Sequence, residues 1–266
     1  MAALSLVVFG VTGRMGQCLV RAIQEGSQFR LSGAIASPGS SRLGQEAAAE
    51  GASSGVRITA DCAAALEGAS VAVDFSVGGA VAAHAWACAR ARVALLVGAT
   101  GIDDPTQAEL HRAAQEIPLL IAPNTSLGVA VLHKLVAAAT VELGSTYEVE
   151  IAEAHHHMKR DAPSGTALSL GELVAGVRGQ RLSEVGIFGR HGTAAPRDPA
   201  GIGFSVLRAG DIVGEHSVTF ATRGERLEIT HRASDRMIFA RGALQAAAWL
   251  IGRPAGLYGM QDVLKV

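Results

Sequence analysis

Residues 4–16 read LSLVVFGVTGRMG, with glycines at positions 10, 13 and 16. Residues 4–9 are almost entirely apolar, which is typical of a buried strand, and a helical pattern follows over 15–25. A glycine-rich turn between a strand and a helix is where a dinucleotide pyrophosphate binds, because glycine lets the backbone approach and the helix start offers free N–H groups. The spacing is GxxGxxG rather than the standard GxGxxG, so a tight turn without a ligand stays the alternative.

Short apolar runs alternate with helical patterns through the rest of the first half of the chain. Expected strands cover 4–9, 31–35, 71–75, 95–98 and 119–122, and helical patterns lie near 15–25, 60–68, 79–92 and 105–116. Such alternation predicts βαβ units and a parallel sheet that is covered on both faces. The fold class expected for residues 1–126 is therefore α/β, a Rossmann-like dinucleotide-binding domain.

The pattern changes after Ser126. A longer helix is expected over 127–143, and strands over 147–154, 203–208, 215–221 and 226–231; a long Gly-, Pro- and Arg-rich loop covers 186–202. Because the last strands follow one another without a full helix between them, an α+β domain with an open mixed sheet is predicted. We expect residues 127–236 to form this substrate-binding domain, and residues 237–266, which begin with an apolar helix, to return to the first domain.

Composition narrows the possible classes of protein. The 266 residues carry a formal net charge of -1, so no broad basic field exists to bind nucleic acid. Cys18, Cys62 and Cys88 show no CxxC spacing, which argues against a disulfide framework and favours a reducing, cytoplasmic location. No membrane span is expected, because the best apolar run is interrupted by His133 and Lys134.

The end of the second strand bears on the choice of coenzyme. NAD sites usually place an acidic residue there to bind the ribose hydroxyls, but this chain has Ser37, with Ser40, Ser41 and Arg42 close by. Hydroxyls and a guanidinium suit a 2′-phosphate, so NADPH is expected to serve at least as well as NADH. The alternative is an exposed ribose that is poorly discriminated.

Three consecutive histidines, His155, His156 and His157, follow the expected strand 147–154, and Lys159 comes two residues later. Histidine titrates near neutral pH and lysine can release its proton, so both suit proton transfer or the binding of a carboxylate. A metal tract is the alternative, with His155 and His157 sharing one strand face. Only Glu153 and Asp161 could add ligands, and no metal is predicted. A surface histidine run without a role is the other alternative.

Ser164 precedes a helical run over 167–177 and is a plausible N-cap. The helix start would present N–H groups to a carboxylate. An ordinary capped helix is the alternative, but next to the histidines and Lys159 it completes a cationic pocket for a small acidic substrate.

Residues 153–167, EAHHHMKRDAPSGTA, resemble the signature of the dihydrodipicolinate reductase family, as do the GVTGRMG, VGATG, PNTSLGV and RAGDIVGEH segments. The resemblance covers essentially the whole chain. It implies NAD(P)H-dependent reduction of 4-hydroxy-tetrahydrodipicolinate, a small cyclic dicarboxylate, in lysine and diaminopimelate biosynthesis. It also implies a homotetramer formed through the second domain.

The resemblance implies a role for each matching residue. His155 would be a proton donor and acceptor, Lys159 a second proton donor that also holds substrate, and His156 with Gly165 and Thr166 would contact the carboxylates. The residues expected to bind the coenzyme are Gly10, Val11, Thr12, Gly13, Arg14, Met15, Ser37, Gly98, Ala99, Thr100, Ala122, Pro123, Asn124 and Thr125. One departure from the family is the missing acid near Ser37, which puts a strict NADH preference in doubt.

Two rival functions share some of these features. Another small-acid dehydrogenase, such as an aspartate-semialdehyde type, would need a thiolate, and Cys62 and Cys88 fall in helical stretches away from the histidines. A non-catalytic NAD(P)H sensor would keep the glycine turn but would have no use for the histidine–lysine motif.

Overall fold

A computed structural model describes residues 3–48, 53–192 and 196–264 of the chain. The chain divides into two compact units. The first contains Met1–Leu127 together with Arg236–Val266, and the second contains Gly128–Asp235. The tail expected to return to the first domain from residue 237 falls in the first unit, although its last two residues lie outside the described part.

The first unit is built on a seven-stranded parallel sheet with the order β12-β6-β5-β4-β1-β2-β3. Its strands are β1 (Leu4–Phe9), β2 (Phe29–Ile35), β3 (Ile58–Thr59), β4 (Val71–Asp74), β5 (Ala94–Val97), β6 (Pro118–Ile121) and β12 (Gly256–Tyr258). Strands β2 and β3 lie on one side of β1. Strands β4, β5 and β6 lie on its other side. The strand order therefore reverses between β1 and β4, and ligands of such sheets bind at the carboxyl ends of the strands at this point.

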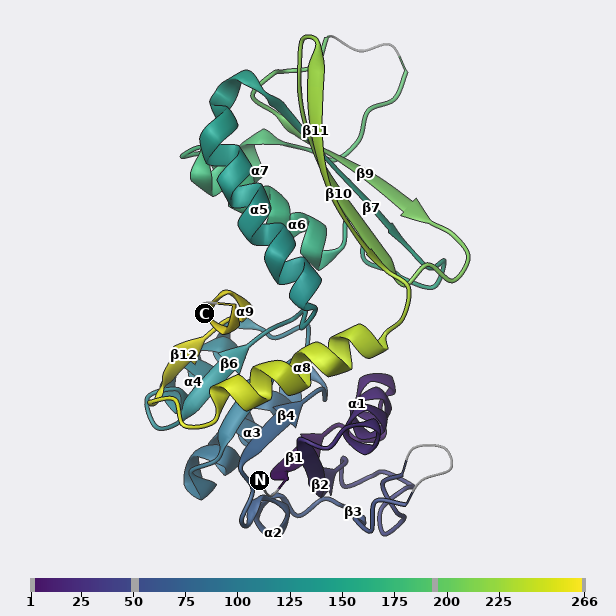
Figure 1. The fold of residues 1–266 in the computed structure, drawn as a ribbon, viewed down its shortest axis with the longest axis vertical. Coiled ribbons are helices and arrows are strands. Elements are labelled where there is room, and N and C mark those ends of the chain that lie inside the picture. The colour runs from purple at the N-terminus through teal and green to yellow at the C-terminus, as the bar shows by residue number, and fades with distance from the viewer. Residues whose placement is uncertain (1–2, 49–52, 193–195, 265–266) are drawn as a thin grey trace. The chain divides into compact units, whose positions relative to one another are not determined.

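Helices cover both faces of this sheet (Figure 1). They are α1 (Arg14–Glu25), α2 (Cys62–Leu66), α3 (Gly78–Ala91), α4 (Asp104–Ala113), α8 (Met237–Leu250) and α9 (Met260–Val263). Helix α8 packs against α1 and against strands β4, β5 and β6. Because helices lie on both faces, β1 is apolar on both sides, and its residues from Leu6 to Phe9 are fully buried.

The second unit has a five-stranded mixed sheet with the order β11-β10-β7-β9-β8. Its strands are β7 (Glu148–His155), β8 (Gly186–Ile187), β9 (Ile202–Arg208), β10 (Gly214–Thr222) and β11 (Glu225–Ala233). Strand β9 runs parallel to β7 and β8, whereas β10 runs antiparallel to β7 and β11. The predicted mixed sheet is thus confirmed.

One face of the second sheet is covered by helices (Figure 1). These are α5 (Leu127–Leu143), which leads into a short 3-10 turn (Gly144–Thr146), α6 (Gly165–Val177) and α7 (Leu182–Val185). Val149 and Ile151 of β7 pack with Val136 of α5 and Leu170 of α6. Side chains alternate along a strand, so Ala152 and its neighbours of the same parity lie on the opposite face, which no described helix of this unit covers.

The expected strands and helices are present with ends that differ by a few residues, and the pattern missed the short elements β3, β8, β12, α7 and α9. The geometry of the metal-tract alternative, with His155 and His157 on one strand face, is not found. Strand β7 ends at His155, so His157 does not share a strand face with it; its backbone N–H and its Nδ1 instead donate to the carbonyl of Gly210, at 3.2 and 2.9 Å.

The expectation about apolar length also needs correction. Residues Leu127–Thr146 form a helix that is long and apolar enough to cross a membrane by length and composition, with a mean hydropathy of 1.5. His133 and Lys134 do not interrupt it. A core helix passes the same test, and the buried face of α5 packs on the second sheet through Leu132 and Val136. This helix is therefore weak evidence for a membrane.

Candidate functional site

The glycine turn joins β1 to α1 with a backbone that only glycine allows. Gly10 has a φ of +74°, and a Cβ there would lie 2.8 Å from the backbone of Phe75 and Ser76. A Cβ on Gly16 would overlap the carbonyl of Gly10. Gly13 is the N-cap of α1 and provides no side-chain cap, so the positive end of the helix dipole lies beside a close-fitting turn. These features suit the binding of a pyrophosphate.

The structure places every predicted coenzyme residue at the same edge of the first sheet. The glycine turn follows β1, Ser37 follows β2, Gly98 to Thr100 follow β5, and Ala122 to Thr125 follow β6. All of these strands are parallel, so their carboxyl ends lie side by side. The Ala122 N–H donates to the carbonyl of Val97 at 2.8 Å, which holds two of the turns together. Contact of these residues with a coenzyme stays a prediction.

The turn after β4 lies between the glycine turn and Gly98, and the sequence pattern did not single it out. A Cβ on Gly98 would overlap the ring of Phe75. Asp74 is fully buried at the end of β4, where its carboxylate accepts a hydrogen bond from Nδ1 of His84 at 2.7 Å and from the Ser76 N–H at 2.7 Å. The His84 ring stacks on Phe9 with a centroid distance of 4.3 Å. The sequence did contain a signal for this turn, since Asp74 is an acidic residue inside the apolar run VAVDF.

In the second unit, the end of β7 carries a buried carboxylate–imidazole pair. Glu153 and His155 lie two residues apart on one strand face, with 4% and 8% of their surfaces exposed. Nδ1 of His155 donates to Oε2 of Glu153 at 2.6 Å. Arg208, at the end of β9, donates to both carboxylate oxygens at 2.7 Å, and the backbone N–H of Ser164 donates to Oε1 at 2.9 Å.

Lys159 lies in the loop that leaves β7. Its backbone N–H donates to the carbonyl of His156 at 3.0 Å, which closes a turn, and its ammonium forms an ion pair with Asp161 at 2.8 Å. Arg208 also donates to the carbonyl of Asp161 at 2.6 Å. The loop therefore carries a half-buried lysine, held next to the residues that surround His155.

Ser164 caps α6, as predicted, and links it to β10. Its hydroxyl accepts a hydrogen bond from the Ala167 N–H at 3.2 Å and lies 2.9 Å from Nε2 of His216. The helix begins at Gly165, two residues earlier than expected, and no atom lies within 4 Å of the Cβ position there. The first turn of α6, with Gly165 and Thr166, thus opens toward space at the same end of this unit as His155.

The charges of this cluster are set by burial and by near neighbours. Burial lowers the pKa of His155, and Glu153 only partly offsets this effect, so the imidazole is neutral near neutral pH. Burial opposes ionisation of Glu153, but hydrogen bonds from Arg208, His155 and Ser164 outweigh it and hold its pKa below the ordinary value. Burial lowers the pKa of His216 to about 3.

No group of three or more His, Cys, Asp or Glu side chains in the described ranges is arranged to hold a metal ion.

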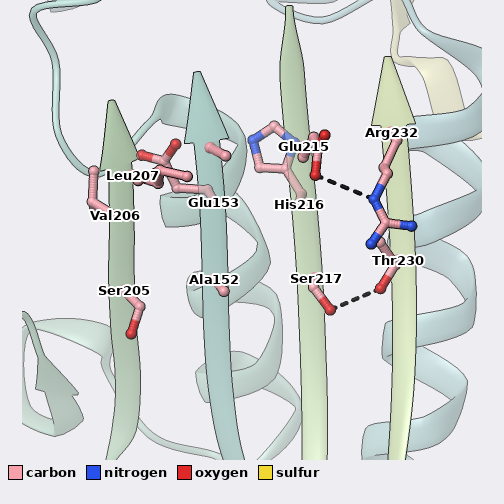
Figure 2. A pocket seen from close by; sticks show the side chains of 11 residues that line it. Ala152, Glu153, Ser205, Val206, Leu207, Glu215, His216, Ser217, Thr230 and Arg232 are labelled. Atoms are coloured by element: carbon pink, nitrogen blue, oxygen red, sulfur yellow. Dashed lines mark hydrogen bonds and ion pairs between the residues drawn. The ribbon is translucent and has the colours of Figure 1, made fainter. Parts of the chain in front are cut away.

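A shallow depression crosses strands β9, β7, β10 and β11 of the second sheet (Figure 2). The hydroxyls of Ser217 and Thr230 form a hydrogen bond at 2.8 Å, and Arg232 donates to Glu215 at 3.2 Å. The polar side chains of the depression therefore largely bind one another. Lys159, Gly165 and Thr166 are not among its lining residues. We therefore do not assign the substrate to this depression.

The cluster includes three residues that sequence reasoning missed as functional candidates. Glu153 was considered only as a possible metal ligand, and Arg208 and His216 lie 55 and 63 positions further along the chain than Glu153. For Glu153 the available signal was its i, i+2 spacing from His155, which puts both side chains on one strand face. Arg208 and His216 begin and end the RAGDIVGEH segment that resembles the family, but nothing in their spacing from Glu153 linked them to His155, because strand pairing alone brings them close.

Comparisons with known families cover nearly the whole chain. A family model described as "Dihydrodipicolinate reductase, N-terminus" matches residues 4–125, and one described as "Dihydrodipicolinate reductase, C-terminus" matches residues 128–264. The 4-hydroxy-tetrahydrodipicolinate reductase of Thiobacillus denitrificans is 47% identical over 260 residues, which is 97% of each chain. That of Acinetobacter baumannii (strain AYE) is 45% identical over 265 residues, covering 99% of this chain and 97% of the relative.

Solved structures support the fold. A dipicolinate-bound dihydrodipicolinate reductase from Paenisporosarcina sp. TG-14 superposes with a TM-score of 0.78 at 22% identity, covering 98% of this chain and 100% of the other. An aspartate semialdehyde dehydrogenase from Vibrio cholerae superposes with a TM-score of 0.53 at 13% identity, covering 94% and 98%. At these identities the likeness shows the fold alone.

Proposed function

Because the chain belongs to the dihydrodipicolinate reductase family, we propose that its first unit binds the nicotinamide coenzyme and that its second unit binds and protonates the substrate. The chain is an NAD(P)H-dependent oxidoreductase that reduces 4-hydroxy-tetrahydrodipicolinate to tetrahydrodipicolinate, a step of lysine and diaminopimelate biosynthesis. When bound, the coenzyme supplies the hydride. The chain's own residues bind and orient both reactants and deliver the proton.

The first unit fits a dinucleotide. At Gly10 a Cβ would lie 2.8 Å from the backbone of Phe75, so the absence of a side chain lets the turns after β1 and β4 lie close together. Gly10, Val11, Thr12, Gly13, Arg14 and Met15 would hold the pyrophosphate, largely through backbone N–H groups. Gly98 to Thr100 and Ala122 to Thr125, from the turns after β5 and β6, would hold the nicotinamide end.

For the adenosine ribose we propose that NADPH is used at least as well as NADH. Ser37 is exposed after β2, and its carbonyl accepts a hydrogen bond from the Ser40 N–H at 2.9 Å, which closes a turn. Arg42 follows on this turn, where its N–H donates to the Ser40 hydroxyl at 3.3 Å. No acidic residue occupies residues 36–42, so nothing in this segment repels a 2′-phosphate.

One observation carries the proposal for the second unit: His155, Lys159 and the first turn of α6 belong to one hydrogen-bonded cluster. The Ser164 N–H and Arg208 tie the helix start and the loop to Glu153 beside His155. His156, Lys159, Gly165 and Thr166 would bind the carboxylates of the cyclic substrate, and His155 or Lys159 would deliver the proton.

A coupled assay tests this function. The substrate is generated with its upstream synthase, the protein is added, and absorbance loss is followed with NADH and with NADPH separately. Substrate-dependent oxidation of either coenzyme is expected. Oxidation without substrate dependence, or none at all with an active synthase, would contradict the proposal and favour a sensor that binds NAD(P)H without turnover.

The thiols argue against the aspartate-semialdehyde type of reaction. Cys62 and Cys88 lie in α2 and α3 of the first unit, and burial raises the pKa of both. A raised pKa leaves little thiolate at neutral pH, so neither is an activated nucleophile.

We further propose that the chain assembles as a homotetramer through the uncovered face of the second sheet. Ser205, Ser217 and Thr230 line its depression, and Leu207, on the same face of β9 as Ser205, is 53% exposed. A face with small polar side chains and exposed apolar ones suits packing against another sheet. A cytoplasmic location is also proposed; three free cysteines support it, and cell fractionation tests it.

A further inference from the structure

We propose that Glu153 is a positioning residue for the reduction, which holds His155 in the tautomer with its proton on Nδ1 and leaves Nε2 for the substrate. Arg208 holds Glu153 in place for this task. The inference rests on the proposed role of His155.

The argument begins with the lone pairs of Glu153. A carboxylate offers about four acceptor positions, and all four are filled: Oε1 accepts from Ser164 and Arg208, and Oε2 accepts from His155 and Arg208. A carboxylate with a bidentate arginine stays ionised and has no proton to donate. The proton in the 2.6 Å contact therefore belongs to Nδ1 of His155.

The other ring nitrogen remains available. The His155 side chain keeps 11% of its surface exposed, so the ring is not sealed off. Nε2 lies over Gly214 of β10, where a Cβ would come within 3.1 Å of it. Glycine at this position leaves space beside the nitrogen that would exchange a proton with the substrate.

Among the residues that the structure describes, Glu153 supplies the negative charge that raises the pKa of the ring and contacts it directly. Around His155 stand Lys159 from the loop, Arg208 from β9 and His216 from β10, and burial with the two cations lowers the pKa of His155. Glu153 acts in the opposite direction. Without it the imidazole would accept a proton only at still lower pH, and its tautomer would no longer be set.

Glu153→Gln tests this inference with Glu150→Gln as its matched control. Glu150 lies on the same strand and binds Arg190 and Arg197, but it is not part of the cluster. In Glu153→Gln the amide oxygen is best placed to accept the hydrogen bonds from the Ser164 N–H and from Arg208. This orientation turns the amide NH₂ group toward Nδ1 of His155. We expect kcat to fall by at least about tenfold, which is a part of the roughly 10²- to 10⁴-fold that proton transfer contributes to the rate. The KM for the coenzyme should not change.

The readout that separates positioning from stability is the ¹⁵N spectrum of the imidazoles, with His155→Asn used to assign the His155 signals. Wild-type protein should show His155 protonated on Nδ1; Glu153→Gln should shift the proton toward Nε2 and move the His155 limb of the pH profile to lower pH. Glu150→Gln should change neither.

Three results would overturn the inference. They are a wild-type His155 protonated on Nε2, a Glu153→Gln variant with wild-type kcat and pH profile, and a slower variant whose tautomer and pH profile are unchanged. The wild-type spectrum needs no substitution, so the test survives a variant that does not fold. Full activity of His155→Asn would instead remove the proposed role of His155, whatever the tautomer.

Discussion

His216 makes the stability of the second unit sensitive to acid. Its side chain is buried against the cluster, with 4% of the residue exposed, and Ser164 contacts its Nε2 at 2.9 Å. Burial is the largest cause of its low pKa of about 3; His155, His231 and Lys159 also lower it, and Glu153 alone raises it. The folded protein therefore holds this imidazole neutral where an unfolded chain would protonate it.

The sign and size of the effect follow from proton linkage. Below a pH of about 6.5 the unfolded chain binds a proton at His216 that the folded chain does not bind, so stability falls as the pH drops toward 3. Each pH unit well below 6.5 costs about 1.4 kcal/mol, and the first unit costs less because the unfolded imidazole is only half protonated at 6.5. Lowering the pH from 6.5 to 4.5 should therefore cost about 2–3 kcal/mol through this residue. Above a pH of about 6.5 its contribution is constant.

Urea unfolding at the two pH values measures this cost when wild-type protein is compared with His216→Gln. Other groups also respond to acid. The pKa values of Glu153 and Asp161 are lowered in the folded protein, so their contributions to its stability are also lost as the pH falls. The difference between wild type and variant removes their share. A glutamine can accept a hydrogen bond from the Ser164 hydroxyl and does not titrate. The variant should therefore lose about 2–3 kcal/mol less stability in acid than the wild type. If both proteins lost the same free energy of unfolding in acid, His216 would not be held neutral in the folded protein.

Three substitutions test the proposed site and assembly. Lys159→Met keeps most of the stem but removes the ammonium, so kcat should fall by roughly 10²- to 10⁴-fold, while calorimetry shows unchanged coenzyme binding; an unchanged kcat would remove Lys159 from the mechanism. Ser37→Asp restores a carboxylate after β2, and the ratio of kcat/KM for NADPH to that for NADH should fall at least about tenfold, a cost of about 1.4 kcal/mol; an unchanged ratio would mean that Ser37 does not face the ribose. Ser217→Arg adds a charge to the uncovered sheet face, and sedimentation velocity should show smaller species than the wild type; an intact tetramer would place the interface elsewhere.

The sheet of the first unit was predictable because burial on both faces leaves an unbroken apolar run. Residues 4–9 show this pattern, and helices on both sides of β1 explain it. Strand β12 escaped prediction because its three residues, Gly256–Tyr258, carry no period and become a strand only by pairing with β6. The same holds for β3, which consists of Ile58–Thr59 beside β2.

The candidate site was predictable where its parts lie close together in the sequence. His155, Lys159 and the start of α6 fall within a dozen residues, so chemistry and spacing could be weighed together. Arg208 could not be found this way, because it reaches Glu153 only through the parallel pairing of β7 with β9, in which His155 stands opposite Arg208. The residues around Arg208 do not tell which strand β9 pairs with, because its partner β7 lies far away in the sequence.

Both units contain a buried carboxylate that binds Nδ1 of a histidine at the end of a strand, Asp74 with His84 and Glu153 with His155. Their surroundings differ in charge. The Asp74 carboxylate is bound by His84 and by the Ser76 N–H, whereas Arg208 binds both oxygens of Glu153 in addition to His155. Hydrogen bonds from Arg208, His155 and Ser164 hold the pKa of Glu153 below its ordinary value, so this buried carboxylate stays ionised beside the imidazole. Arg208 is therefore the feature that distinguishes a pair suited to proton transfer from one suited to holding a turn.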